Sequence, residues 1–299
     1  MREEIALIKK AKTILAQIGA APRRKLGQNF MVSEQALSSI VEALSLDGQD
    51  TVLEIGAGLG FLTRRLLQKT ERVIAVEKDP LFAHYLREAF KTAPLKIVEK
   101  DVLDCRLERD FAVKGKVKVV GNIPYGITSP ILGWLVGERR RVSESALTVQ
   151  WEVARRLWAK PGTKDWGALS VFAQFYSEVS LVKKIGRGNF FPAANVDSAV
   201  VRLVFPEKPL YRVRDEEKLF GIVRRAFQKR RKTLFNALKD RTGAADRPLL
   251  PIFAELRIDP KRRPETLSIE EWAALSESGG GHFCVDGMRF VGDDGGRYA

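Results

Sequence analysis

The chain has 299 residues, of which 45% are hydrophobic, so it can bury a full core in one large and one small domain. Lysine and arginine number 51 against 37 acidic residues, and the net charge of +14 favours a polyanionic partner, nucleic acid first. A basic surface without a partner is the alternative. With only two cysteines and two histidines, we expect no disulfide framework and no Cys/His metal site, as fits a reducing compartment.

The amino-terminal segment is expected to form an amphipathic helix over Ile5–Ile18. Lys9, Lys10 and Lys12 interrupt its apolar residues, which argues against a secretory leader, and no later segment reaches membrane-spanning length. We therefore expect a cytoplasmic chain with no membrane partner, monomeric when free.

From Thr51 onward, short strand-like runs alternate with helical periods. Strands are expected at 51–55, 72–77, 95–98, 117–120 and 147–149. One helix is expected from about Phe61, and another opens at Asp79–Pro80 with aspartate at the N-cap and proline in the first turn. An apolar helical stretch, Ile131–Val136, separates the last two strands. This alternation predicts an α/β fold with a doubly wound, mostly parallel sheet.

Beyond about Phe205 the pattern changes to helices without strands. These are expected at 216–227, 233–239, 249–256 and 269–276, the last with Ser268 and Glu271 in capping-box spacing. We therefore place a boundary near Pro206–Pro209. The expected organisation is a larger domain over 1–206, a small all-helical domain over 207–276 and a flexible glycine-rich tail over 277–299.

A glycine-rich turn follows the first predicted strand. In Glu54-Ile-Gly-Ala-Gly-Leu-Gly60, the glycines allow a tight turn and a close approach of the backbone to a ligand. Phe61 stands where a dinucleotide-binding loop has its last glycine, which disfavours a pyrophosphate ligand without excluding it.

Carboxylates end the next two predicted strands. Glu77 follows the glycine turn by about twenty residues, where it can accept hydrogen bonds from both ribose hydroxyls of an adenosine-type cofactor. Asp101 ends the third strand and can accept from the adenine amine. Each acid alone could be a solvated strand-end charge. Three strand ends in register at one edge of the sheet point to an adenosine-containing ligand.

The fourth predicted strand ends in Asn122-Ile-Pro-Tyr125. An aromatic amine is a weak nucleophile because its lone pair is delocalised into the ring, so its N–H bonds must be directed at acceptors. The side-chain oxygen of Asn122 and the carbonyl of Ile123 can be those acceptors, while Pro124 fixes the turn and Tyr125 stacks on the base. Methyl transfer from a sulfonium leaves a neutral thioether, so positioning carries most of the acceleration and no metal is needed. The same four residues are also a good turn sequence.

Five motifs occur in the order typical of ribosomal RNA adenine dimethyltransferases, and the chain resembles that family from about Gly19 to Ser276. The motifs are Leu26-Gly-Gln-Asn-Phe30, Glu54–Gly60, Asn122–Tyr125, Val196-Asp-Ser-Ala-Val200 and Arg230-Arg-Lys-Thr-Leu234. The resemblance is strongest to the members that dimethylate two adjacent adenosines near the 3′ end of 16S rRNA. It implies a Rossmann-like, class I S-adenosylmethionine-dependent methyltransferase fold.

The resemblance also implies roles for individual residues. The residues expected to contact S-adenosylmethionine, and its product S-adenosylhomocysteine, are Gln28, Asn29, Gly56, Gly58, Glu77, Asp101 and Asn122. Asn122, Pro124 and Tyr125 would form the catalytic turn, and Phe190 would pack with Tyr125 around the target base. The implied partner is small-subunit rRNA in an immature ribosomal subunit.

The sequence departs from the family pattern at a few positions. Ala193 and Ala194 stand in a loop that is proline-rich in relatives, Trp151 replaces a commonly polar residue, and Phe235 stands where arginine is frequent. These differences could alter RNA docking but leave the expected cofactor residues intact.

Basic residues are concentrated where the first two helices of the small domain are expected. The set expected to bind RNA is Arg224, Arg225, Lys229, Arg230, Arg231 and Lys232. Such a patch can follow phosphates but cannot read bases. A solvated helix face is the alternative, and we prefer RNA because a base-modifying site on the same chain needs a docking surface.

Three other functions stay open on the sequence alone. A large-subunit rRNA adenine methyltransferase of the erythromycin-resistance type shares the same motifs, although the Arg230–Leu234 element argues against it. A non-catalytic small-subunit assembly factor would not need an intact Asn122–Tyr125 turn. A DNA adenine methyltransferase would usually carry an acidic residue in place of Asn122.

Overall fold

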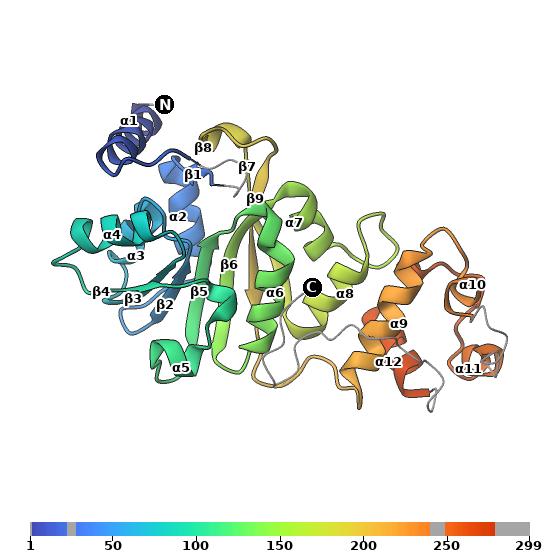
Figure 1. Ribbon diagram of the computed structural model, residues 1–299. Coiled ribbons are helices and arrows are strands. Elements are labelled where there is room, and N and C mark those ends of the chain that lie inside the picture. Colours follow the sequence, from blue (N-terminus) through green and yellow to red (C-terminus); the bar gives the residue numbers. More distant parts are fainter. Residues whose placement is uncertain (1, 23–27, 240–248, 279–299) are drawn as a thin grey trace. The chain divides into compact units, whose positions relative to one another are not determined.

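The computed structural model describes residues 2–22, 28–239 and 249–278 (Figure 1). The chain divides into two compact units, and it crosses between them three times. The first unit comprises residues 1–154 and 179–205, and the second comprises 155–178 and 206–299.

A seven-stranded sheet with the order β4-β3-β2-β5-β6-β9-β7 forms the centre of the first unit (Figure 1). The strands are β2 (Thr51–Ile55), β3 (Arg72–Glu77), β4 (Leu95–Glu99), β5 (Val117–Asn122), β6 (Val142–Gln150), β7 (Glu178–Ile185) and β9 (Ser198–Val204). Strands β2 to β6 are parallel, and β9 runs antiparallel to β6. The predicted doubly wound, mostly parallel sheet is confirmed. The sequence pattern did not reveal β7 and β9.

Helices α3 (Phe61–Leu66), α4 (Pro80–Ala89), α5 (Leu107–Phe111) and α6 (Thr128–Gly137) connect the successive parallel strands of this sheet. Helices α1 (Arg2–Gln17) and α2 (Glu34–Ala43) precede β2, and α7 (Trp151–Trp158), whose second half belongs to the other unit, follows β6. At the start of α4, the Asp79 carboxylate accepts from the Leu81 amide at 3.0 Å, and Pro80 occupies the first turn. This confirms the N-cap that the sequence predicted.

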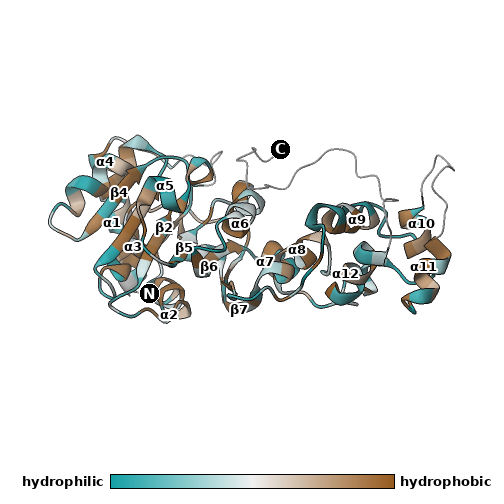
Figure 2. Cartoon of the chain, turned by 90° about the horizontal axis from the view of Figure 1, so that it is seen from below, coloured by the Kyte–Doolittle hydropathy of each residue, from teal (hydrophilic) through white to brown (hydrophobic). Residues whose placement is uncertain are grey.

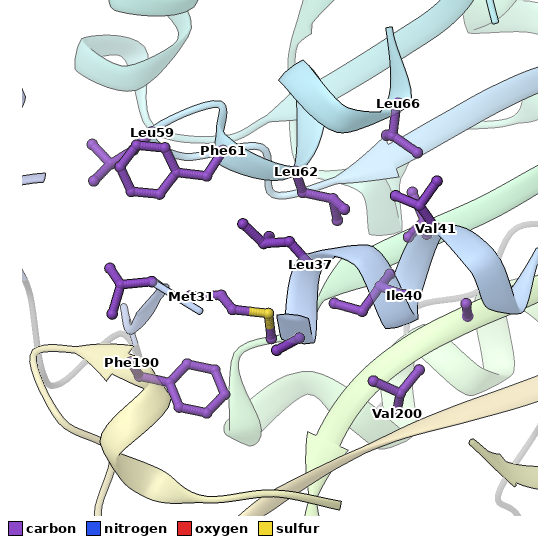
Figure 3. Close-up of a cluster of buried hydrophobic side chains, with 14 of the residues drawn as sticks. Met31, Leu37, Ile40, Val41, Leu59, Phe61, Leu62, Leu66, Phe190 and Val200 are labelled. Carbon is purple, nitrogen blue, oxygen red and sulfur yellow. The ribbon is translucent and has the colours of Figure 1, made fainter. Parts of the chain in front are cut away.

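A second, two-stranded sheet joins segments that are far apart in the chain. Strand β1 (Phe30–Met31) pairs antiparallel with β8 (Phe190–Phe191), with Met31 opposite Phe190. Figure 3 shows both residues among the apolar side chains that pack around α2 and α3. The labelled members of this cluster are Met31, Leu37, Ile40, Val41, Leu59, Phe61, Leu62, Leu66, Phe190 and Val200. The burial of each side chain of this size stabilises the folded state by roughly 1.5–3 kcal/mol, so the cluster holds the glycine turn firmly against its neighbours.

The second unit is helical. Its elements are α8 (Ala168–Tyr176), α9 (Glu216–Gln228), α10 (Leu234–Leu238), α11 (Leu249–Glu255), the 3-10 helix η5 (Pro264–Thr266) and α12 (Ile269–Ser278). The mixed hydropathy along α9 can be followed in Figure 2, and its apolar residues Leu219, Ile222 and Val223 are buried. At the start of α12, the Ser268 amide donates to Glu271 at 2.8 Å and the Glu271 amide donates to the Ser268 hydroxyl at 3.3 Å. The four predicted helices and this capping box are confirmed.

The division of the chain differs from the expected one in one segment. One crossing lies between Phe205 and Pro206, where a boundary was expected, but residues 155–178 also group with the helical unit. The reason is tertiary packing, since Phe172 of α8 lies 5.4 Å, ring to ring, from Phe220 of α9. The Trp166 indole also donates to the Leu267 carbonyl at 3.0 Å. The expected tail lies almost wholly outside the described residues, because α12 continues to Ser278.

Candidate active site

The turn after β2 requires glycine at two positions. Gly56 has φ +71° and donates its amide to the Val76 carbonyl at 2.8 Å. Gly60 has φ +72°, and a Cβ atom there would lie 2.5 Å from the Phe90 ring. The positive φ angles favour glycine at both positions, and at Gly60 the Phe90 ring also leaves no room for a side chain. The turn therefore keeps its backbone close to the carboxyl ends of β2 and β3.

A cavity of about 400 Å³ opens at this edge of the sheet, a size suited to a small organic ligand. Its walls combine the glycine turn, the ends of β3, β4 and β5, the 28–31 segment, and apolar side chains of α2 and α3. All seven residues expected to contact the cofactor line it, namely Gln28, Asn29, Gly56, Gly58, Glu77, Asp101 and Asn122. The fold therefore brings together residues that span almost a hundred positions of sequence.

Glu77 is 7% exposed and is held by two backbone amides. One carboxylate oxygen accepts from Gly58 at 2.8 Å and the other accepts from Asp79 at 2.9 Å. Burial raises the pKa of the Glu77 carboxyl, and the backbone hydrogen bonds oppose that rise. Each oxygen of the ionised group keeps a free acceptor site, so the carboxylate can receive two neighbouring hydroxyl groups from the cavity.

Asp101 caps the 3-10 helix η2 (Val102–Asp104) that follows β4. One of its oxygens accepts from the Leu103 amide at 3.0 Å, and the other pairs with the ammonium of Lys78 at 2.6 Å. The Lys78 side chain is largely exposed, so this pair is weak and easily rearranged. The Asp101 carboxylate can thus still accept from an amine in the cavity.

Asn122 is the last residue of β5, and its side-chain amide has a defined orientation. Its nitrogen donates to the main-chain carbonyl of Asn29 at 2.7 Å. A carbonyl accepts only from the NH₂ end of a primary amide, so the Asn122 oxygen is left as the free acceptor beside the cavity. Asn29, the residue before β1, therefore determines which end of the Asn122 side chain faces a substrate.

Tyr125 begins the 3-10 helix η3 (Tyr125–Ile127), which follows Pro124. Pro124 lines the cavity, whereas the Tyr125 ring is half-buried against the apolar cluster and is hydrogen bonded, oxygen to oxygen, with Ser198 at 2.8 Å. Burial raises the pKa of the Tyr125 phenol, and the Ser198 bond partly opposes this. The tyrosine is therefore a neutral aromatic side chain at physiological pH.

Phe190 is only 3% exposed and packs in the apolar cluster, as Figure 3 shows. In this conformation its ring is covered by neighbours such as Met31, the residue opposite it in the small sheet. Neither side chain is among the described residues that line the cavity: Phe190 lies within the apolar cluster, and Tyr125 packs partly buried against the same cluster, next to the cavity residue Pro124. The role of Phe190 beside a target base stays a prediction.

Glu54 is a cavity residue to which the sequence assigned no role of its own. It is 1% exposed, and one oxygen accepts from the Thr63 hydroxyl at 2.6 Å. Burial raises the pKa of its carboxyl to about 7, and the nearby Glu77 contributes to the rise. The available signal was a glutamate inside the otherwise apolar end of the strand, Thr51–Ile55.

The residues expected to bind RNA lie in the second unit and have different surroundings. Arg224 and Arg225 are on α9, Lys229 caps it, and Arg231 and Lys232 are exposed in the turn before α10. Arg230 instead donates to the Lys164 carbonyl at 2.5 Å and pairs with Glu265 at 3.8 Å. Arg230 therefore joins two segments of its own unit, while Arg231 and Lys232 face solvent.

Neither a metal-binding cluster nor a membrane span is present in the described residues. Within residues 2–22, 28–239 and 249–278, no three His, Cys, Asp or Glu side chains are grouped so that they could hold a metal ion. No helix in the same part of the chain is long and apolar enough to cross a membrane.

Comparison with known proteins gives the family. The family model for ribosomal RNA adenine dimethylase matches residues 19–278. The chain belongs to this family. Two relatives named ribosomal RNA small subunit methyltransferase A, from Bacillus mycoides (strain KBAB4) and Bacillus cereus (strain AH187), are 39% and 40% identical to it. Each alignment covers 92% of this chain and 97% of the relative.

Solved structures agree with the fold of a ribosomal RNA adenine dimethylase. The 23S rRNA methyltransferase ErmE is 28% identical, with a TM-score of 0.66 over 84% of this chain and 99% of that one. A dimethyladenosine transferase from Plasmodium falciparum has a TM-score of 0.71 at 24% identity, over 82% of this chain and 95% of that one, and supports the fold alone. The class I methyltransferase fold and the enzyme class are confirmed: this is an enzyme of an S-adenosylmethionine-dependent rRNA methyltransferase family.

Proposed function

We propose that the chain dimethylates the N6 amines of two adjacent adenosines near the 3′ end of 16S rRNA, within an immature small ribosomal subunit. Relatives of nearly equal length that carry the small-subunit name are 39% and 40% identical to it. The structure of a 23S rRNA enzyme is 28% identical. The higher sequence identity to the small-subunit enzymes favours the small ribosomal subunit as the substrate.

The observation that carries this proposal is the orientation of Asn122. The Asn29 carbonyl takes up its NH₂ end at 2.7 Å, so its oxygen is available to accept one N–H of an adenine amine. The carbonyl of Ile123, the next residue, would accept the other N–H. With both N–H bonds directed at acceptors, the nitrogen lone pair faces the cavity, where a methyl donor would lie.

The cavity residues fit S-adenosylmethionine. Glu77 would accept from both ribose hydroxyls with the acceptor sites that Gly58 and Asp79 leave free. Asp101 would accept from the adenine amine of the cofactor, and the glycine turn would lie against its amino-acid part. The cofactor, when bound, supplies an electrophilic methyl group on a sulfonium whose sulfur keeps the electron pair of the broken C–S bond.

Positioning by the chain then accounts for most of the rate. Asn122 and Ile123 would hold the amine in line with the methyl group that the bound cofactor would supply. The amine proton that becomes acidic after transfer leaves to solvent, so no strong base is required. Tyr125 would stack on the adenine, which must be turned out of its RNA stack at a cost of a few kcal/mol.

RNA docking is proposed for the second unit. Its exposed cations, Arg231 and Lys232 with the neighbouring Lys229, would neutralise phosphates and release counterions. The binding energy that these contacts supply would offset the cost of extruding the base. Phosphate contacts hold the RNA in register but carry no sequence information themselves.

One assay separates the candidate functions. Purified small subunits that lack this modification are incubated with the enzyme and labelled S-adenosylmethionine, and mass spectrometry maps the products. We expect two dimethylated adenosines near the 3′ end of 16S rRNA. Methylation of large subunits alone would support the erythromycin-resistance type, methylation of DNA would support a DNA enzyme, and binding without methyl transfer would support an assembly factor.

A further inference from the structure

The Val196-Asp-Ser-Ala-Val200 motif has no reactive chemistry of its own in the proposed mechanism. Its central residue, Ser198, is fully buried as the first residue of β9. The Ser198 hydroxyl lies 2.8 Å from the Tyr125 hydroxyl, although the two residues are 73 positions apart. The Ser198 side chain therefore links the motif to the Asn122–Tyr125 turn.

We propose that Ser198 is a positioning residue for methyl transfer, which fixes the direction in which the Tyr125 ring extends and so holds the ring where it receives the target adenine. The proposal rests on the stacking role that the proposed function gives Tyr125. It adds that the tyrosine hydroxyl serves this orientation, since stacking alone requires only an aromatic ring.

The Tyr125 ring is held at both ends. Its backbone follows Pro124 in a 3-10 turn whose Pro124 carbonyl accepts from the Ile127 amide at 3.1 Å. The ring packs partly against the apolar cluster, while its far end meets Ser198. The hydroxyl oxygen of a tyrosine lies on the axis of its Cβ–ring bond, so this hydrogen bond fixes the direction of that axis, while the apolar contacts limit rotation of the ring about it.

Ser198 is itself rigidly supported. In the sheet it pairs with Gln150 of β6, and the preceding carbonyl, that of Asp197, accepts from the Trp151 amide at 2.9 Å. The Asp197 carboxylate accepts from the Arg187 amide at 3.1 Å and pairs with Lys184 at 3.0 Å. The start of β9 is thus fixed by backbone, side-chain and ionic contacts. The Ser198 hydroxyl therefore has a fixed position, from which it can hold Tyr125 on its turn.

The experiment compares the rate of a single methyl transfer at saturating RNA and cofactor. The proteins are the wild type, Ser198→Ala, Tyr125→Phe and the double variant. Each single variant removes the same hydrogen bond, so we expect each to slow transfer about 5- to 10-fold. The double variant should be no slower than the slower single variant, because the shared bond can be removed only once. Calorimetry should give an unchanged affinity for S-adenosylmethionine.

Ser145→Ala is the matched control. Ser145 is also fully buried in the same sheet, on β6, but its hydroxyl makes no hydrogen bond within the described part of the chain. We expect the wild-type rate from this variant. A role of Ser198 in stability alone would lower the melting temperature and leave the transfer rate unchanged, which would overturn the proposal.

Other results of these experiments would also overturn the proposal. Wild-type rates in Ser198→Ala or Tyr125→Phe, or losses that multiply in the double variant, would overturn the proposal. If Ser198→Ala does not fold, Tyr125→Phe removes the same hydrogen bond from the half-buried partner without leaving a cavity, and the transfer rate of Tyr125→Phe alone tests the proposal.

The rates are measured on whichever ribosomal subunit accepts methyl groups, so a wrong subunit assignment leaves this test intact. Full activity of Tyr125→Ala would instead contradict the stacking role within the proposed function.

Discussion

The side-chain amide of Asn122 donates to the main-chain carbonyl of Asn29 at 2.7 Å, across 93 positions of sequence. This bond joins the end of β5 to the residue before β1, and β1 is held in turn by β8. The orientation of Asn122 is therefore determined by two segments outside its own motif. The first prediction follows from this arrangement.

Asn122→Asp should abolish most of the turnover while changing cofactor affinity little. A carboxylate has no N–H to donate, so the Asn29 carbonyl would face an oxygen and the side chain would rotate away. Misplacement of this kind costs about 100-fold or more in rate. Single-turnover methylation measures the loss, and calorimetry with S-adenosylmethionine is the control. Asn122→Ala should behave similarly, and normal turnover in both variants would contradict the mechanism.

Glu77→Gln should weaken S-adenosylmethionine binding by roughly 10- to 100-fold, the loss expected for a buried polar contact left mismatched. The amide NH₂ would face the Gly58 or Asp79 N–H, both donors, and one acceptor for the ribose would be missing. Glu99→Gln is the matched control, because Glu99 pairs with Glu77 in the β3–β4 register but is exposed. Equal affinities of the two variants would remove Glu77 from the site.

The buried Glu54 should make stability depend on pH. Its pKa is raised from 4.5 to about 7 by burial, so the folded chain keeps a proton that the unfolded chain releases between these values. Its contribution to the free energy of unfolding is complete below about pH 4.5, falls as the pH rises to about 7, and is then constant. Glu54→Gln cannot ionise and should lack this dependence.

Urea unfolding at pH 6 and pH 8 tests this prediction. Between the two pH values the wild type should lose on the order of 1 kcal/mol more stability than Glu54→Gln. Glu99→Gln, which changes an exposed and paired glutamate, should keep the wild-type dependence. Parallel pH profiles of the wild type and Glu54→Gln would show that Glu54 ionises normally in the folded chain.

Charge reversal at Arg231 and Lys232 should weaken RNA binding and leave cofactor binding unchanged. Both are exposed in the turn before α10. Each phosphate contact that is lost should reduce the slope of log binding constant against log salt concentration by roughly one unit. Arg212→Glu, at another exposed cation of the same unit, is the control for net charge. An equal effect of Arg212→Glu would indicate that only overall charge matters.

Arg230→Ala should instead lower the stability of the second unit. Its guanidinium donates to the Lys164 carbonyl and pairs with the mostly buried Glu265. Losing one such hydrogen bond costs about 1 kcal/mol, which thermal unfolding can resolve. The exposed Arg231 provides the comparison, since Arg231→Ala should leave the melting temperature unchanged. Identical melting behaviour of the two alanine variants would contradict this assignment.

The sequence alone determined the features that depend on residues within one or two turns. The Asp79–Pro80 helix start, the Ser268 and Glu271 capping box, and the glycine turn from Gly56 to Gly60 all form as expected. At the two helix starts the interacting groups are at most a few residues apart, and in the turn the positive φ angles are a property of the glycines themselves, so residue type and spacing fix the geometry. The strand-end carboxylates also converge, because parallel strands present their carboxyl ends at one edge.

Tertiary structure decided the relationships between distant segments. It buried Phe190 against Met31, grouped residues 155–178 with the helical unit, and oriented Asn122 through Asn29. None of these has a local pattern, because the partners meet only after the sheets and helices pack. The Tyr125 and Ser198 hydroxyls illustrate the limit: each residue belongs to a recognisable motif, yet their bond exists only because β5 and β9 are brought together on either side of β6.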